Sequence, residues 1–147
     1  MRIQALGHVV VRVSDRARAE AFYSGVLGLE LCARYDENGI RMAFFTLGNH
    51  HDFAVMEEAG VAPGAGATGL HHVAFRIGDR IEQLIEARAK LEAAGVTSTP
   101  IDHEVTKSLY IADPDGNGVE LYIDASDSWR RDPQRVAQIA PLELAPA

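Results

Sequence analysis

The feature that most constrains this chain is an internal repeat of a ten-residue segment. LGHVVVRVSD at residues 6–15 aligns without a gap with LHHVAFRIGD at residues 70–79. Such repeats indicate two copies of one supersecondary unit, neither of which buries its apolar face alone. The aligned identities are Leu6 with Leu70, His8 with His72, Val9 with Val73, Arg12 with Arg76, and Asp15 with Asp79.

Each copy of the repeat alternates in a way that predicts a β-strand followed by a helix. Successive strand residues point to opposite faces, so the first copy presents His8, Val10 and Arg12 together. The second copy presents the matching set that contains His72. Asp15 and Asp79 follow the two strands, and we expect each to cap the helix that comes next.

Three short strands are predicted after each helix, which gives the order βαβββ twice. The predicted strand segments are residues 29–35, 41–48 and 52–57 in the first half and 97–102, 108–113 and 118–124 in the second. The expected fold class is α+β, with two paired βαβββ modules that form a shared metal-binding cleft. The expected boundaries within a single domain (1–147) are a first module at 5–57, a Gly/Ala/Pro-rich linker at 58–69, a second module at 70–124 and a tail at 125–147.

A carboxylate inside an apolar strand suggests what the cleft binds. Alternation places Glu120 and Tyr122 on one face of their strand, and Val119 and Leu121 on the other. A buried carboxylate is costly unless it is paired or binds a metal. His8 and His72 share one register in the two halves, whereas His71 has the opposite phase. Two histidines and one carboxylate with open positions form the facial triad of non-haem iron(II) oxygenases. Mn, Zn, Co or Ni also fit this ligand set.

Composition excludes several function classes. The net charge of −7 argues against nucleic-acid binding, because no basic patch is present to neutralise phosphates. The single cysteine gives no disulfide framework, which is consistent with a reducing cytoplasm. The first residues show no signal-peptide pattern, and no apolar run is long enough for a membrane span. We therefore expect a cytoplasmic protein without a nucleic-acid or membrane partner.

The repeat and the segment DPDGNGVELY resemble the vicinal oxygen chelate superfamily over roughly residues 5–124. Within that superfamily, the longer pattern is similar to the small single-domain extradiol ring-cleavage dioxygenases. The residues that carry it are His103, Tyr110, the Asp113-Pro114 pair and Glu120, together with Gly116. The segment NHHDFAV resembles the His-Asp stretch of the same enzymes, and its matching histidine is His51.

This resemblance implies a mechanism and a set of roles. It implies iron(II) held by His8, His72 and Glu120, a catecholic substrate bound through both oxygens, and dioxygen as the second substrate. It assigns His51 to proton transfer near dioxygen, and it places His103 and Tyr110 beside the bound catechol. It also implies a homo-oligomer. Many extradiol enzymes carry four modules, whereas this chain carries two.

Two other readings stay open at this point. A metal-dependent lyase, isomerase or epimerase would keep the fold and use Ni, Zn, Co or Mn without oxygen. A glyoxalase of this kind needs a fourth ligand from the first half, where the matching strand offers Ala54 and Val55. A resistance-type protein that sequesters a small molecule is the third reading, although such proteins often lack the ligand triad.

Overall fold

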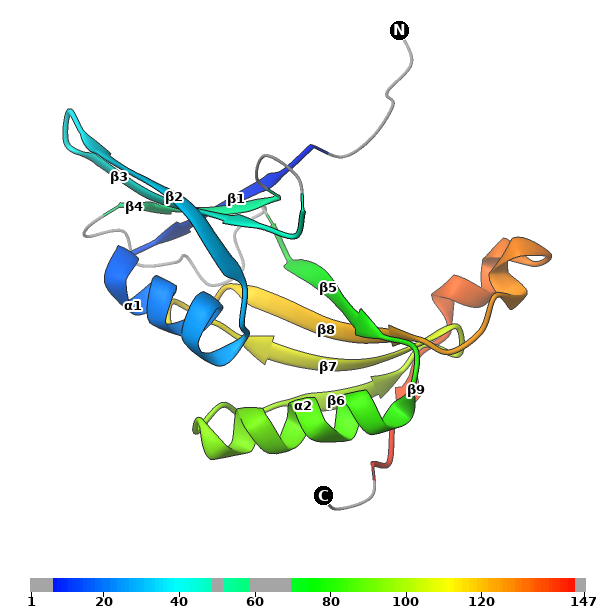
Figure 1. Cartoon of the computed structure of the whole chain (residues 1–147). Helices are drawn as coiled ribbons and strands as arrows, with labels where there is room; N and C mark the ends of the chain where they lie inside the picture. The colour runs from blue at the N-terminus through cyan, green and yellow to red at the C-terminus, as the bar shows by residue number, and fades with distance from the viewer. Residues whose placement is uncertain (1–6, 49–51, 59–69, 145–147) are drawn as a thin grey trace, which may run out of the picture. The chain divides into compact units, whose positions relative to one another are not determined.

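The computed structural model describes residues 7–48, 52–58 and 70–144 and has an α+β architecture with two sheets (Figure 1). The chain divides into two compact units. The first contains the residues up to Thr68 together with Pro114–Gly116, and the second contains Gly69–Asp113 and Asn117–Ala147. The predicted fold class, α+β, is confirmed.

The first unit follows the predicted βαβββ order. β1 (Val9–Val13) leads into α1 (Arg16–Glu20), which continues as the π-helical segment η1 (Ala21–Val26). The strands that follow are β2 (Glu30–Glu37), β3 (Ile40–Thr46) and β4 (Phe53–Glu57). The sheet order is β1-β4-β3-β2, with β1 and β4 parallel. Its core is aromatic, because Tyr23 packs on Phe45 and Phe53 with ring centroids 5.9 and 4.6 Å away.

The second unit repeats this topology and extends it. Its elements are β5 (His72–Gly78), α2 (Ile81–Ala93), β6 (Thr99–Asp102), β7 (Thr106–Ala112) and β8 (Gly118–Asp124). β5 and β8 are parallel, as β1 and β4 are in the first unit. The tail forms two 3-10 turns, η2 (Ser128–Arg130) and η3 (Pro133–Ala137), and a short strand, β9 (Ala140–Pro141), which pairs with the edge strand β6.

The sheet of the second unit has one apolar face and one polar face. Val119, Leu121 and Ile123 of β8 are buried, and α2 packs against β5, β7 and β8 with Leu84 and Leu91 in the core. The alternate residues Glu120 and Tyr122 point to the other face, where the pocket described below lies. The face assignment predicted from alternation is therefore confirmed for β8.

The structure corrects two local predictions. β1 begins at Val9, so His8 directly precedes the strand instead of lying within it. Asp15 caps α1 as expected, accepting a hydrogen bond from the Arg18 amide at 3.0 Å. Asp79 does not cap α2, because the Gln83 side chain turns back and accepts from the backbone amides of Asp79 and Arg80, each at 3.0 Å.

Within the part of the chain that the structure describes, no helix combines the length and the apolar character that crossing a bilayer requires.

Candidate functional site

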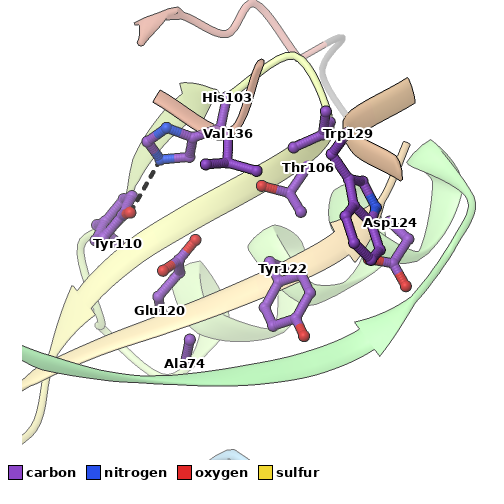
Figure 2. Close-up of a pocket in the computed structure, with 10 residues that line it drawn as sticks. Ala74, His103, Thr106, Tyr110, Glu120, Tyr122, Asp124, Trp129 and Val136 are labelled. Carbon is purple, nitrogen blue, oxygen red and sulfur yellow. Dashed lines mark hydrogen bonds between the residues drawn. The ribbon is translucent and has the colours of Figure 1, made fainter. Parts of the chain in front are cut away.

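The second unit contains a pocket of about 450 Å³ on the face of the sheet opposite α2. β7 and β8 supply half of its lining residues, and the tail contributes Trp129 and Val136 (Figure 2). Volumes of roughly 300–1,000 Å³ are typical of small-molecule sites. The lining residues are Ala74, His103, Val105, Thr106, Tyr110, Glu120, Tyr122, Asp124, Trp129 and Val136.

Glu120 is the buried carboxylate of this pocket, with only 8% of its surface exposed. Its Oε1 accepts a hydrogen bond from the Ser108 hydroxyl at 2.5 Å. Its Oε2 lies 3.2 Å from Nε2 of His72. These partners offset the free-energy cost of removing the carboxylate from water inside an apolar strand. The Glu120 carboxylate and the His72 imidazole nitrogen therefore lie side by side, as two ligands of one metal ion would.

His72 reaches Glu120 because β5 and β8 lie close together where they begin. His72 pairs with Gly118 in the parallel register. A Cβ atom at Gly118 would lie 2.3 Å from the His71 carbonyl oxygen, so only glycine fits this approach. His72 also shares a hydrogen bond through Nδ1 with Nδ1 of His71, at 2.8 Å. Its Nε2 therefore faces Glu120 while its other ring nitrogen is held from outside the pocket.

Tyr110 joins Glu120 to His103. It lies opposite Glu120 in the β7–β8 register, and its hydroxyl is 2.9 Å from Nε2 of His103 (Figure 2). Burial, the negative charge of Glu120 and a hydrogen bond to that carboxylate raise the pKa of Tyr110 to about 12. Tyr110 therefore keeps its proton at neutral pH. That one proton lies within reach of two acceptors, the carboxylate and the imidazole.

The tail fixes the orientation of His103. Nδ1 of His103 lies 2.9 Å from the backbone carbonyl oxygen of Gln138. A carbonyl oxygen only accepts, so Nδ1 carries a proton. In the neutral ring, Nε2 is then unprotonated and accepts the Tyr110 hydroxyl. This arrangement can take up or return a proton at the Tyr110 oxygen.

The predicted site residues fall into three groups. His103, Tyr110 and Glu120 line the pocket, and His72 contacts Glu120. His8 is exposed directly before β1 in the first unit, and His51 lies outside the described residues. Across residues 7–48, 52–58 and 70–144, no group of three or more His, Cys, Asp or Glu side chains is close enough to hold a metal ion. The full ligand set of His8, His72 and Glu120 stays a prediction.

The two repeated arginines, Arg12 and Arg76, form ion pairs with carboxylates. Nε of Arg12 lies 2.9 Å from Glu58, and Nε of Arg76 lies 2.6 Å from Asp124. Each arginine is therefore paired with a carboxylate at the end of, or just beyond, the strand that runs parallel to its own.

The sequence interpretation missed several residues that shape the site. Ser108 is fully buried and bonded to Glu120. It lies two residues before Tyr110 on β7, so strand alternation was a signal that could have placed it on the pocket face. Trp129, Val136 and the Gln138 carbonyl come from the tail, for which no periodic pattern gives a position.

His72 and Glu120, the two possible ligands that lie together, fit a divalent transition metal. An imidazole nitrogen and a carboxylate oxygen converge from adjacent strands, and both are typical ligands of Fe, Mn, Zn, Co and Ni. A ligating histidine normally bonds a second partner through its other nitrogen, and His71 is that partner here. One further protein ligand on the open side would complete a facial triad.

Known proteins match this chain over most of its length. It is 35% identical over 131 residues to catechol-2,3-dioxygenase from Bacillus subtilis (strain 168), covering 86% of this chain and 44% of that protein. It is 34% identical over 119 residues to biphenyl-2,3-diol 1,2-dioxygenase 2 from Rhodococcus globerulus, covering 80% and 61%. The chain thus spans about half the length of these curated dioxygenases. Glutathione transferase FosA from Serratia marcescens is 30% identical over 121 residues, with 82% of each chain covered.

Solved structures share the fold. A glyoxylase/bleomycin resistance protein/dioxygenase domain from Frankia sp. EAN1pec superposes with a TM-score of 0.71 at 20% identity, covering 84% of this chain and 99% of that one. The family model for the glyoxalase/bleomycin resistance protein/dioxygenase superfamily matches residues 5–121. The chain therefore belongs to this superfamily, the vicinal oxygen chelate proteins.

Proposed function

We propose that this chain is an iron(II)-dependent extradiol dioxygenase that opens the ring of a catechol-type diol. Dioxygen breaks the ring carbon–carbon bond beside the diol, and both oxygen atoms enter the product, so no external reductant is needed. The observation that carries the proposal is the placement of the pocket residue Glu120 between His72 on one side and the Tyr110–His103 pair on the other. The names of the two dioxygenase relatives support it.

Three residues are proposed to hold the metal. The superfamily includes metal-dependent enzymes of several activities. His72 and Glu120 would supply two ligands here, and His8 would supply the third. Iron(II) so held would act as a Lewis acid that lowers the pKa of a bound hydroxyl and as a redox centre that couples the diol to dioxygen.

The other pocket residues would handle protons and exclude water. The Tyr110 oxygen would accept the proton that a diol hydroxyl loses, while Tyr110 passes its own proton to Nε2 of His103. Because its pKa is raised to about 12, Tyr110 would stay a neutral phenol before and after this transfer. His51 is proposed to transfer a proton near dioxygen. Proton transfer by a positioned group typically contributes ~10²–10⁴-fold to rate.

Oxygen uptake tests the proposal. The protein would be loaded anaerobically with iron(II) and mixed with oxygen and a panel of catechols. We expect catechol-dependent oxygen consumption with a growing yellow ring-cleaved product. Glu120→Gln should abolish both, and Glu86→Gln, an exposed position on α2, should leave both unchanged. A loaded metal site that consumes no oxygen with any catechol would contradict the proposal.

A metal-dependent transferase or lyase is the second candidate. One observation favours it: the FosA match covers 82% of that protein, whereas the catechol dioxygenase match covers 44%. The metal content of the purified protein discriminates the candidates. Iron supports the dioxygenase, Zn, Ni, Co or Mn supports the transferase or lyase, and a protein that retains none of them supports a small-molecule binding role.

A further inference from the structure

Glu104 adopts a backbone conformation that glutamate does not favour. Its φ is 64°, and among the described residues the other non-glycine with a positive φ is Asn38, at 55°. Asn38 is followed by Gly39 in the turn between β2 and β3, where asparagine and glycine are the usual residues. Glutamate has no such preference for the left-handed region, so the conformation of Glu104 calls for a different explanation.

The turn at Glu104 is tight and directly follows His103. The Val105 amide donates to the His103 carbonyl oxygen at 2.7 Å, across Glu104, as in a γ-turn. A γ-turn with a positive φ at its central residue is rare and strained. Strained backbone persists only where the surrounding contacts determine it, and it is concentrated at functional sites. The functional neighbour here is His103, whose Nε2 lies 2.9 Å from the Tyr110 hydroxyl (Figure 2).

Polar contacts hold Glu104 through both its backbone and its side chain. Its amide donates to the Asp102 carboxylate at 2.6 Å, and the Lys107 ammonium bonds the same carboxylate oxygen. The bond from Lys107 lowers the pKa of Asp102, and the bond from the Glu104 amide acts in the same direction, so Asp102 stays an ionised acceptor at neutral pH. The Glu104 carboxylate forms an ion pair with Arg135, which lies in η3 of the tail.

The ion pair with Arg135 explains why a glutamate occupies this position. Glycine would adopt the same φ without a steric cost, but it has no side chain to hold the tail. Arg135 lies three residues before Gln138, whose carbonyl oxygen is 2.9 Å from Nδ1 of His103. The tail is thus attached at two neighbouring points, the His103 ring and the side chain of the next residue. An exposed ion pair adds little to stability, so its effect is on where the tail lies.

We propose that Glu104 is a positioning residue that holds the tail, and with it the Gln138 carbonyl, against His103. Without the ion pair the turn would keep its shape, but the acceptor at Nδ1 of His103 would no longer be fixed. Nε2 would then carry the ring proton in part of the molecules and could not accept from Tyr110. Glu104 therefore acts on the chemistry only through His103. Its effect on the imidazole stands without the proposed function, whereas its effect on turnover rests on that function.

Long-range ¹H–¹⁵N spectra of His103 in the metal-free protein test the proposal. Glu104→Gly keeps the turn and removes the ion pair, and Arg135→Gln removes the same ion pair from the other side. We expect both variants to shift His103 toward the Nε2-protonated form by the same amount. The double variant should shift it no further, because all three proteins lack one and the same interaction. Glu104→Gly should unfold at a midpoint no lower than that of the native chain, because glycine relieves the strain.

Two control variants leave the ion pair intact. Asn38→Gly places glycine at the other positive φ, and Arg131→Gln removes a charge from an exposed position of the same tail. Neither should change the His103 spectrum. A native spectrum in Glu104→Gly or in Arg135→Gln would overturn the proposal, as would an equal change in either control.

Oxygen uptake by the iron-loaded protein separates this inference from the proposed function. Where the native chain consumes oxygen with a catechol, Glu104→Gly should lower kcat by roughly tenfold or more, a part of the ~10²–10⁴-fold that positioned proton transfer contributes. Oxygen uptake together with a His103 spectrum that does not depend on Glu104 would overturn this inference alone. A spectrum that depends on Glu104, without oxygen uptake by the native chain, would overturn the proposed function and leave the positioning role standing.

Discussion

At the scale of single residues, the site depends on how Glu120 is held. A carboxylate with 8% of its surface exposed stays charged at low cost only where its oxygens have partners. Ser108 and His72 contact different oxygens of Glu120, so the serine orients the carboxylate while the histidine lies against its other oxygen. Ser108 would affect a metal ion bound at Glu120 only through that carboxylate, so it is a positioning residue.

Ser108→Ala should therefore weaken metal binding without removing a ligand. Loss of an outer partner of a ligand typically costs 10–100-fold in affinity, roughly the range expected here. Calorimetric titration of the protein with iron(II) or Mn(II) in the absence of oxygen measures the change. Ser126→Ala is the control, because Ser126 is exposed, accepts a hydrogen bond from the Ser128 amide and does not line the pocket. Unchanged affinity in Ser108→Ala would show that Glu120 does not depend on the serine.

Tyr110 gives a prediction about pH. Its pKa is raised from the ordinary 10.0 to about 12 by burial first and then by the charge of Glu120. The folded state thus favours the neutral phenol. The stability that this preference contributes is complete below pH 10 and is lost as the pH rises toward 12.

Spectrophotometric titration of the metal-free protein checks the Tyr110 pKa. The difference between the native chain and Tyr110→Phe should show one phenol that ionises near pH 12. The difference in unfolding free energy between the two proteins should also shrink between pH 10 and 12. A difference titration centred at pH 10 would contradict the burial of the hydroxyl beside Glu120.

At the scale of elements, alternation in the sequence predicted which side chains share a strand face, but not how the second helix begins. Alternation placed Glu120 and Tyr122 on one face of β8 because side-chain direction has a period of two. Alternation could not predict the N-terminal cap of α2. The Gln83 side chain accepts the hydrogen bonds there instead of Asp79, because of the path that the chain takes after Gly78. A Cβ at Gly78 would lie 2.1 Å from Oε1 of Gln83, so the glycine makes room for this contact.

For the C-terminal tail, local sequence pattern predicts even less of the structure. β9 is two residues long and exists only because it pairs with the edge of β6, so propensity gives no signal for it. The resemblance to extradiol dioxygenases predicted His103 and Tyr110, but the Gln138 carbonyl that orients His103 belongs to a tail segment that the resemblance does not cover.

Removal of the tail should change the tautomer of His103. A chain that ends at Ala137 lacks the Gln138 carbonyl, so Nδ1 loses its acceptor and the ring should populate the Nε2-protonated form. Long-range ¹H–¹⁵N spectra of the imidazole distinguish the two tautomers. A chain that ends at Leu142 keeps Gln138 and β9 and is the matched control. The same His103 spectrum in both truncated chains would show that the tail does not set the tautomer.

At the scale of the whole molecule, the internal repeat leads to the prediction that both units supply ligands to one metal ion. His8 and His72 hold equivalent positions in copies of one topology. The predicted metal would take His8 from the first unit and His72 with Glu120 from the second. A ligand that binds only the folded chain stabilises it by mass action, by about 4 kcal/mol at a thousand times its dissociation constant. Metal bound by both units would couple their unfolding, whereas metal bound by the second unit alone would stabilise that unit only.

Calorimetric unfolding with and without Mn(II) tests this coupling. The native chain should unfold in one transition whose midpoint rises with metal by roughly 8–16 °C, at about 2–4 °C for each kcal/mol. His8→Ala should lose most of this rise, as His72→Ala should, because either change removes one ligand. Val10→Thr alters an exposed residue of β1 beside His8 and should keep the rise. A full metal-induced rise in His8→Ala, with loss in His72→Ala, would place the whole metal site in the second unit and exclude His8 as a ligand.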